Sequence, residues 1–377
     1  MKIDFNTTIL NQLLYKHTDK LNKINSKFPK ITEWQSDKSK PTLNQLVTLA
    51  NYFNIPFGYF FLNKLPVVQY PVPHYRSGNG GNFTPSDELM DTIRDIEERQ
   101  KWARDLRKDF QEPLQFANSL TVNTDPKKAA QKVREILNVE ENWSKDKTIK
   151  SWDDAFRFLI RQTEDAGIFV VCNGVVNNNT TRKLKVEEFR GFVLHDEYAP
   201  FVFINNNDFI SGKIFTIIHE VIHILIGKSA SFDNKELLPA SEQTERYCDA
   251  VTAEFLVPES LLLREVRLVG NNYDKLSQNF RVSRIVIARR LFDLNRITKT
   301  EFDNAYKTFK SYKIEKVVKA TNGGNFYNTA TYRISKSFFN LIYSSVRQHK
   351  ILYRDAFRLT SLTPKSFDGY VKRNYEQ

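Results

Sequence analysis

The chain has 377 residues, of which 41% are hydrophobic, and this content is ample for the cores of about two to four domains. Its two cysteines, Cys172 and Cys248, exclude a disulfide framework and favour a reducing compartment. The sequence shows neither a signal peptide nor a run of about 20 apolar residues that would span a membrane. We therefore expect a cytoplasmic protein without membrane contacts.

The net charge of +12 is concentrated at the two ends of the chain. Residues 1–70 carry nine Lys against four acidic residues, and residues 301–377 carry fourteen Lys and Arg against six acidic residues, so the middle is nearly neutral. Basic ends on a neutral body suggest that nucleic acid or an acidic partner meets the ends. The alternative is compositional, because the chain is rich in both Lys and Asn.

Residues 1–65 are predicted to form a domain of short helices. Thr42 is expected to cap a helix whose inner face carries Leu46, Leu49, Ala50 and Phe53. The order of Trp34, this helix and Asn54-Ile55-Pro56 resembles the last half of a phage-repressor (XRE-type) helix-turn-helix domain. The segment Lys27–Trp34, KFPKITEW, is too short for the usual turn and recognition helix. This departure weakens the case for DNA binding and favours a degenerate domain that serves as an interaction module or a structural cap.

Residues 66–150 are predicted to be a linker followed by helices. Prolines at positions 66, 71, 73 and 85 and the tract Gly78–Asn82 break any regular element in the first part. A long polar helix is expected over Asp87–Phe110. A second helix is expected over Asp125–Leu137, with Asp125 as its N-cap and Pro126 in its first turn.

Residues 151–268 have the pattern of a compact enzyme domain. An amphipathic helix over Trp152–Ala166 precedes apolar strands, which are predicted over Ile168–Cys172, Phe189–Leu194 and Phe201–Ile204. An apolar helix that contains Thr216–Gly227 follows. We therefore predict the α+β class, as a mainly helical multidomain protein in which one domain combines a small mixed sheet with this apolar helix. A sheet edge next to such a helix is suited to holding an extended peptide.

The apolar stretch Thr216–Gly227, TIIHEVIHILIG, contains the pattern H-E-x-x-H. His219 and His223 are four residues apart, so on a helix they lie on one face and both imidazoles can reach one Zn2+. Glu220 can then act on a zinc-bound water as the general base. The alternative is that two histidines share a helix by chance.

A catalytic zinc needs a third protein ligand, and the best candidate is Glu245, 22 residues after His223. It lies on a second predicted helix, which Pro258 closes. Asp249 shares a helix face with Glu245 and can accept the second N–H of a ligating histidine, which would fix the tautomer of that ring.

Three neighbours of Glu245 are expected to be less suited to bind the metal. Glu254 is nine residues from Glu245, about 180° around the helix, and should point elsewhere. Glu242 is expected to precede the helix and is the weaker competitor as a ligand. Cys248 is expected to lie off the ligand face, as a small buried residue.

The pattern H-E-x-x-H followed by E-x-x-x-[D/N] resembles that of gluzincin metallopeptidases, and it is more similar still to the ImmA/IrrE family of zinc peptidases. The similarity includes the segment Ala253–Pro258 after the proposed third ligand. It extends along nearly the whole chain, to a V-P-x-[Y/F]-R segment at Val72–Arg76, an F-R-G-F-x-L strand at Phe189–Leu194 and a Tyr-Ala-Pro turn at Tyr198–Pro200.

The resemblance implies a zincin-like catalytic domain, in which a small mixed sheet lies beside the metal-binding helix. It also implies an intracellular zinc endopeptidase that cleaves regulatory proteins, typically DNA-binding repressors, in response to DNA damage or another signal. Genes of this group often lie in mobile elements, phage-related clusters or toxin–antitoxin pairs. A toxin or antitoxin is therefore implied as a partner as well.

Residues 269–312 are predicted to form a helix-turn-helix-like module. Two helices within Leu276–Ile297 are joined by a Val-Ser turn, and the module has a basic face that suits DNA, made by Arg281, Arg284, Arg289 and Arg290. The alternative is a helical hairpin that packs on the peptidase domain as scaffold. Residues 313–377 are predicted to be a basic helical segment that either packs on the rest or grips a partner.

Two functions are compatible with these patterns. In the first, the protein is a zinc endopeptidase, and Glu220 takes a proton from the attacking water and passes it to the leaving amine. The oxyanion then needs a donor, for which His195, Tyr198 and Tyr247 are candidates. In the second, the protein is a zinc-stabilised DNA-binding regulator or antitoxin-like protein without proteolysis. Glu220 weighs against the second, because a structural zinc site has no use for a general base.

Overall fold

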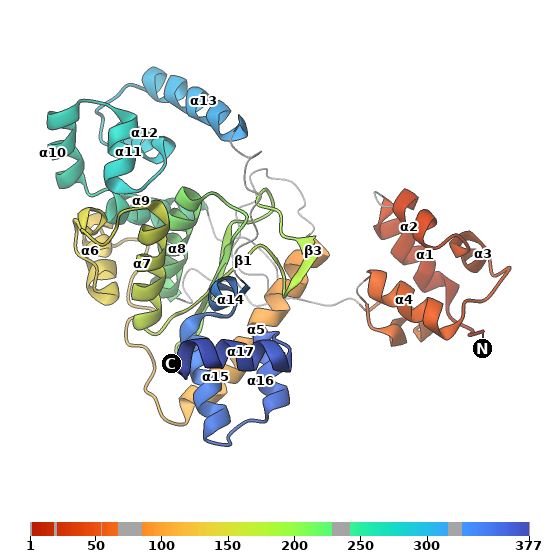
Figure 1. Cartoon of the computed structure of the whole chain (residues 1–377). Coiled ribbons are helices and arrows are strands. Elements are labelled where there is room, and N and C mark those ends of the chain that lie inside the picture. The colour runs from red at the N-terminus through yellow and green to blue at the C-terminus, as the bar shows by residue number, and fades with distance from the viewer. Residues whose placement is uncertain are drawn as a thin grey trace. The chain divides into compact units, whose positions relative to one another are not determined.

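The computed structural model describes residues 2–18, 21–53, 55–66, 85–227, 242–315 and 326–376. Contacts divide the chain into two units, Met1–Tyr70 and Pro71–Gln377. The chain is mainly helical, with a small mixed sheet in the second unit (Figure 1). The α+β class predicted from the sequence is confirmed. The predicted V-P-x-[Y/F]-R segment, Val72–Arg76, lies outside the described residues.

The first unit is a small helical domain, built from α1 (Thr7–Lys16), α2 (Leu21–Lys27), α3 (Ile31–Gln35), α4 (Leu43–Phe53) and the 3-10 helix η2 (Phe57–Phe61). Thr42 caps α4 as predicted, because Gln45 N donates to Thr42 Oγ1 at 3.3 Å and Thr42 N donates to Gln45 Oε1 at 2.8 Å. Helix α3, which carries the buried Trp34, has five residues. The position of a recognition helix therefore holds little more than one helical turn.

The helices of the second unit are, in chain order, α5 (Asp87–Lys108), α6 (Pro126–Leu137), η3 (Trp143–Lys145), α7 (Trp152–Asp165), α8 (Ile210–Ile226), α9 (Glu242–Leu256), α10 (Glu259–Val269), α11 (Tyr273–Phe280), α12 (Arg284–Asp293), α13 (Lys299–Glu315), α14 (Phe326–Ile334), α15 (Lys336–Arg347), α16 (Tyr353–Thr360) and α17 (Pro364–Tyr375). Its strands are β1 (Phe169–Asn173), β2 (Val175–Val176), β3 (Asn179–Lys183), β4 (Gly191–Leu194) and β5 (Phe201–Asn205). Asp125 caps α6 as predicted. None of the described helices is both long enough and apolar enough to cross a membrane.

A three-stranded mixed sheet forms the centre of the second unit. β5 is the middle strand, parallel to β1 and antiparallel to β4. Every residue of these three strands is buried, as expected for a sheet that is covered on both faces. β4 is an edge strand, and its first residue, Gly191, pairs with Ile204 of β5.

One face of the sheet packs against α7 and α8. The side chains on this face belong to the largest hydrophobic cluster among the described residues and include Val170, Val202 and Ile204. Helix α7 begins at Ser151, which forms a reciprocal capping box with Asp154. Helix α9 packs on α8, and α6 packs on α9, so the face is covered by successive helices.

The opposite face of the sheet is aromatic and is covered by the C-terminal helices. Residues alternate between faces along a strand, so Phe169 and Phe201 point away from Val170 and its neighbours. The ring of Phe338 in α15 lies 5.5 Å from Phe169, 5.4 Å from Phe201 and 5.7 Å from Trp102 of α5, measured between ring centres. Of the two possibilities left open for the tail, packing on the rest of the chain is therefore observed for its first helices.

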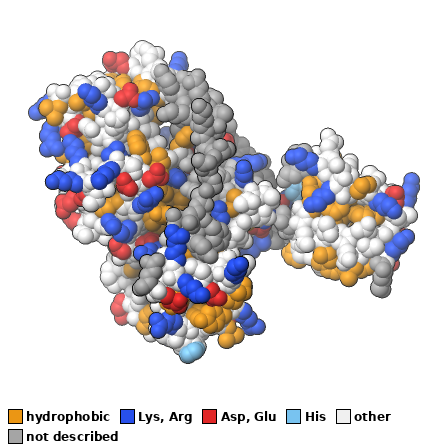
Figure 2. All heavy atoms as spheres, in the orientation of Figure 1, with side chains coloured by type: hydrophobic (Ala, Val, Ile, Leu, Met, Phe, Trp, Pro, Cys, Tyr) orange, Lys and Arg blue, Asp and Glu red, His pale blue; other side chains and the backbone are white. Residues whose placement is uncertain are grey.

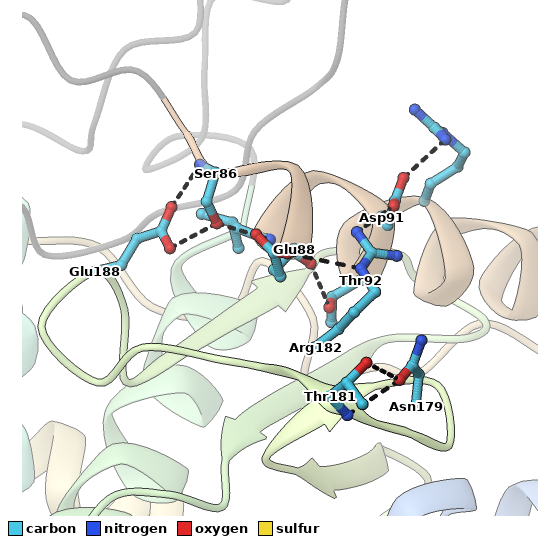
Figure 3. Close-up of polar contacts among 10 residues, drawn as sticks. Ser86, Glu88, Asp91, Thr92, Asn179, Thr181, Arg182 and Glu188 are labelled. Atoms are coloured by element: carbon cyan, nitrogen blue, oxygen red, sulfur yellow. Dashed lines mark hydrogen bonds and ion pairs between the residues drawn. The ribbon is translucent and has the colours of Figure 1, made fainter. Parts of the chain in front are cut away.

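A polar cluster joins the start of α5 to the separate two-stranded β2–β3 sheet and to the segment before β4 (Figure 3). Arg182 of the β2–β3 hairpin reaches the carboxylates of Asp91, at 2.7 Å, and Glu88, at 3.6 Å. Glu188, shortly before β4, accepts hydrogen bonds from both the backbone N and the Oγ of Ser86, each at 2.7 Å. The segment that leads into β4 is thereby anchored on α5.

Candidate metal centre

Helix α8 carries the H-E-x-x-H motif into the interior of the second unit. The helix is apolar on nearly every side, as expected for a helix buried in a core. Against this background His219, Glu220 and His223 are also buried, each no more than 5% exposed. Buried polar groups require partners, and α9 brings several of them to the two histidines.

Two imidazoles and one carboxylate converge on a single point. His219 Nε2 and His223 Nε2 are 3.2 Å apart. The carboxylate oxygens of Glu245 lie 3.2 Å from His219 Nε2 and 3.3 Å from His223 Nε2. Among the described residues, these three form a group whose candidate ligand atoms all lie within 4.8 Å of one another. The structure thus brings together the three side chains that were predicted from the sequence to be ligands.

The electrostatics of this cluster suit a bound cation. Burial by itself would raise the pKa of the Glu245 carboxyl, but hydrogen bonds with His219 and His223 and the charges of these rings outweigh burial and hold the pKa well below its ordinary value. Two protonated rings with Nε2 atoms 3.2 Å apart would repel each other. Two neutral rings and a carboxylate offer three lone pairs around one point, which a divalent cation would satisfy.

Helix α9 also supplies a partner for the outer nitrogen of each imidazole. Asp249 Oδ1 lies 3.1 Å from His219 Nδ1, and a proton on Nδ1 would leave the Nε2 lone pair directed toward Glu245 and His223. Cys248 Sγ lies 3.7 Å from His223 Nδ1, and the thiol is buried. The expectation that Cys248 lies off the ligand face is therefore wrong. It follows Glu245 by three residues, and on a helix such residues are neighbours.

Strand β4 approaches the Glu220 carboxylate closely at Gly191. A Cβ atom at position 191 would lie 2.4 Å from Thr216 Cγ2 and 3.3 Å from Glu220 Oε1. Glycine therefore allows the helix and the strand to come together here. The strand was predicted from the sequence, but this role of its first residue was missed. A lone glycine in an otherwise apolar strand is the signal that could have revealed it.

Two other carboxylates of α9, those of Glu254 and Glu242, were considered as alternatives to Glu245. Glu254 forms a buried ion pair with Arg290 of α12, so it points away from Glu245 as expected. Helix α9 begins at Glu242, so the expectation that Glu242 precedes the helix is wrong. The side chain of Glu242 lies outside the described part of the chain.

Tyr247, one of three proposed oxyanion donors, lies on a different side of α9. It is two residues from Glu245, about 200° around the helix. Burial raises the pKa of its phenol, and the nearby Thr124 side chain acts in the opposite direction. Tyr247 thus faces the segment before α6, and the structure does not bring it to Glu245.

The other two proposed oxyanion donors, Tyr198 and His195, belong to the loop between β4 and β5. Arg107 of α5 donates a hydrogen bond to Tyr198 O at 2.8 Å, and the Lys108 ammonium lies 5.4 Å from the centre of the Tyr198 ring. Tyr198 is therefore held against α5. His195 is half-buried and directly follows the last residue of β4. A role for either residue in stabilising the oxyanion stays a prediction.

Two family models match parts of the chain. Residues 334–373 match DUF8813, a domain of unknown function. Residues 164–292 match Peptidase M78, the IrrE N-terminal-like domain, and this match includes α8, α9 and all three convergent side chains. A search of curated proteins gave no match. The prediction of an IrrE-type peptidase is confirmed: residues 164–292 are a metallopeptidase domain of the Peptidase M78 family, with a candidate metal site at His219, His223 and Glu245.

Proposed function

We propose that the protein is a zinc-dependent endopeptidase that cleaves a regulatory protein. The observation that carries this proposal is the convergence of His219 Nε2, His223 Nε2 and the Glu245 carboxylate at a buried point of an M78 metallopeptidase domain. Glu220, directly after the first histidine, is the general base that such a centre requires. Structural zinc sites are usually closed by four protein ligands, whereas three converge among the described residues.

Zinc is the metal that this set of donors fits best. Two imidazole nitrogens and one carboxylate oxygen form a ligand set used by zinc hydrolases. Magnesium and calcium prefer oxygen ligands alone, so the two imidazoles disfavour them. The Cys248 thiol, which a softer metal would prefer, lies beside the outer nitrogen of His223. Zinc supplies a Lewis acid and lowers the pKa of its bound water to about 7.

The residues of the chain divide the remaining tasks. His219, His223 and Glu245 hold the metal, and Asp249 orients the His219 ring by accepting its Nδ1–H. Glu220 accepts a proton from the attacking water and passes it to the nitrogen of the leaving amine. Because Glu220 is 5% exposed, few solvent molecules compete with the substrate for its carboxylate.

We infer that the substrate binds as an extended strand along β4. Among the described residues β4 pairs with β5 alone, so its second edge has no strand partner there. At the far end the Leu194 carbonyl accepts a hydrogen bond from Gln100 Nε2 at 2.8 Å, which leaves Gly191–Val193 for the substrate. Glu220 Oε1 lies beside Gly191, so a peptide added at this edge would pass the general base.

The substrate class and the domain roles are also proposals. The M78 match supports a protein substrate in general terms. A repressor, or a toxin or antitoxin partner, is proposed because of the resemblance to ImmA/IrrE peptidases. In this proposal residues 1–65 and the helices after residue 312 select what reaches the peptidase domain, while residues 66–150 and 269–312 support it.

The alternative function, a zinc-stabilised DNA-binding regulator without proteolysis, has less support. It relied in part on a basic face in residues 269–312. The four arginines of that face are engaged within the chain: Arg281 donates to Ile149 O, and Arg284, Arg289 and Arg290 form ion pairs with Asp274, Asp293 and Glu254. Contacts within the chain thus largely neutralise the positive charge of this face, and little of it is left to attract nucleic acid.

The decisive experiment is Glu220→Gln, tested on a library of peptides prepared from a whole proteome. We expect the zinc-loaded wild-type protein to cut internal bonds. The variant should retain one zinc per chain, because Glu220 is not a ligand, and should cleave at least about 100-fold more slowly, because proton transfer is lost. Mass spectrometry of the new peptide ends and elemental analysis of the protein provide the two measurements.

The matched control is Glu187→Gln, which makes the same change at an exposed glutamate two residues before Phe189. We expect wild-type cleavage from this control. Equal cleavage by the Glu220→Gln variant, or an absence of zinc-dependent cleavage in the wild type, would contradict the proposed function.

A further inference from the structure

Helices α16 and α17 form a helix–turn–helix unit near the C-terminus. Helix α16 has 8 residues and α17 has 12, and residues 361–363 join them. Ser361 opens the turn in the left-handed conformation, with φ 54° and ψ 26°. Thr363 caps α17, whose first residue is Pro364. A short helix, a three-residue turn and a second helix are the dimensions of the DNA-binding helix-turn-helix motif.

Aromatic packing fixes α17 across the two preceding helices (Figure 1). Phe367 of α17 lies 5.1 Å from Phe339 of α15 and 5.4 Å from Phe357 of α16, measured between ring centres. Tyr370, one turn on, is 4.3 Å from Phe339. The buried positions on the inner side are Ala356, Thr360, Leu362, Phe367 and Tyr370. The three helices thus share a core and present one side of α17 outward.

The outward side of α17 is polar and basic. Lys365, Asp368 and Lys372 recur at intervals of three and four residues and are all exposed. Over residues 347–376 the exposed charged side chains are seven Lys and Arg against two acids, Asp368 and Glu376, and two of the arginines, Arg354 and Arg358, form ion pairs with Asp355 and Glu98. Figure 2 shows Lys and Arg side chains, with some Asp and Glu between them, over the lobe that contains α15–α17, beside one apolar patch. Among the described residues no ion pair holds Lys365 or Lys372.

A second helix–turn–helix unit in the same chain has its second helix covered by another helix, and it serves as a comparison for α16–α17. Helix α11 has 8 residues, residues 281–283 form the turn with Arg281 left-handed, and α12 follows. The positions of α12 that match Lys365, Asp368 and Lys372 in α17 are Ile285, Ala288 and Phe292. These are apolar, and α13 packs over α12, with Phe292 and Phe302 stacked at 5.3 Å.

We propose that the α16–α17 unit binds double-stranded DNA, with the outward side of α17 in the major groove. In such motifs the second helix contacts base edges with its N-terminal residues, and the first helix crosses the backbone. Lys365 and Lys372 supply positive charge for the phosphates and base edges, and Asp368 can accept from a cytosine amino group. The unit coincides with the DUF8813 match at residues 334–373, so this assigns a ligand class to that domain.

The test uses the full chain and a fluorescein-labelled 30-base-pair duplex of mixed sequence, with binding followed by anisotropy at several salt concentrations. Non-specific binding of this kind has a Kd on the order of 10⁻⁴ to 10⁻⁶ M at physiological salt and weakens steeply as salt rises. We expect the double variant Lys365→Ala/Lys372→Ala to bind about tenfold more weakly. The slope of log K against log salt should fall by about 2, because each lysine that is removed leaves one phosphate with its counterions.

The matched control is Arg289→Ala/Lys307→Ala, which removes the same charge from exposed positions on α12 and α13. It should change affinity by less than about twofold. Should the α17 variant not fold, acetylation of the wild-type protein gives the same answer, because bound duplex would protect Lys365 and Lys372 and leave Lys307 reactive. Salt-independent or absent DNA binding, equal losses in both double variants, or protection of Lys307 alone would overturn the proposal. It stands or falls independently of the peptidase activity.

Discussion

The two ends of helix α9 hold carboxylates with opposite kinds of partner. Near the start, Glu245 lies between His219 and His223, within 3.3 Å of both Nε2 atoms. In the last turn, Glu254 forms a buried ion pair with Arg290 of the neighbouring helix α12. Glu254 is buried and Glu245 is half-buried, so each is stabilised by a positive charge nearby.

The difference lies in where the positive charge comes from. Arg290 is charged at any pH at which the protein folds, so the pair it forms with Glu254 is complete within the chain. The two histidines are neutral near pH 7 unless their surroundings hold their protons. The first end of α9 therefore needs a cation from solution, and changes there should appear in metal binding. Changes at the second end should appear in folding stability.

Glu245→Ala should have the largest effect. It removes one of three ligands. Loss of a residue that only hydrogen-bonds to a ligand lowers metal affinity by roughly 10–100-fold, and the loss of zinc affinity here should be larger than that. Peptide cleavage should fall to background. For the wild type, zinc at about 100 times its Kd should stabilise the fold by about 2.7 kcal/mol. Thermal unfolding with and without zinc measures this, and the two curves of the variant should coincide. A variant that still gains stability from zinc would remove Glu245 from the ligand set.

Glu254→Ala tests the other end of the helix. Removing one partner of a buried ion pair leaves an unpaired buried charge, so we expect the free energy of unfolding to fall by about 3–5 kcal/mol. Zinc content per folded chain should stay at the wild-type level, because Glu254 points away from the histidines. Urea unfolding and elemental analysis measure the two quantities. The double variant Glu254→Leu/Arg290→Met should recover most of the stability, since it leaves no buried charge.

If Glu254→Ala instead loses zinc while it keeps its stability, the contrast between the two ends of α9 is wrong. The pair of variants is informative because the two changes are chemically identical and nine residues apart on one helix. Opposite outcomes cannot then be ascribed to the loss of a glutamate as such.

The convergence of the ligands could be predicted because a catalytic zinc needs a third protein ligand and because helical periodicity decides which residues of one helix share a face. That rule links His219 with His223, and Glu245 with Asp249. It also puts Cys248 beside Glu245, but no local pattern reveals that the thiol meets an imidazole of another helix. Gly191 was missed for the same reason. Its importance depends on the register of β4 and on how closely α8 crosses that strand.

Elements with strong local signals were also predictable, such as α6 with its Asp125 cap. Strand β3 was not predicted, because Asn179–Lys183 is polar and mostly exposed and lacks an alternating pattern. The strand order β1-β5-β4 and the packing of Phe338 on the sheet arise from contacts between distant segments. The boundary expected at residue 268 stays a prediction. The M78 match continues to residue 292, and the Glu254–Arg290 pair joins α9 to α12 across that boundary.

Asp249→Ala should have an intermediate effect at the first end of α9. It removes the carboxylate 3.1 Å from His219 Nδ1, which we propose orients that ring and makes it a better ligand. We expect zinc affinity to fall by about 10–100-fold, measured by competition with a chelating indicator. Asp249→Asn keeps an acceptor oxygen at the same position and should recover most of the affinity. Equal losses in both variants would show that the charge of Asp249, and not its hydrogen bond, is what matters.

Cys248→Ala should have the smallest effect. Its thiol lies 3.7 Å from His223 Nδ1, and sulfur is a weak hydrogen-bond partner, so zinc affinity should fall by about threefold. The control is Cys172→Ala. Cys172 is buried in β1 against Asn206, and burial raises the pKa of this thiol to about 12, so it stays protonated and should leave zinc affinity unchanged. If the two cysteine variants bind zinc equally tightly, the thiol beside His223 merely fills space. If zinc affinity falls in Cys248→Ala and not in Cys172→Ala, the Nδ1 side of each metal-facing histidine is positioned by its own residue of α9.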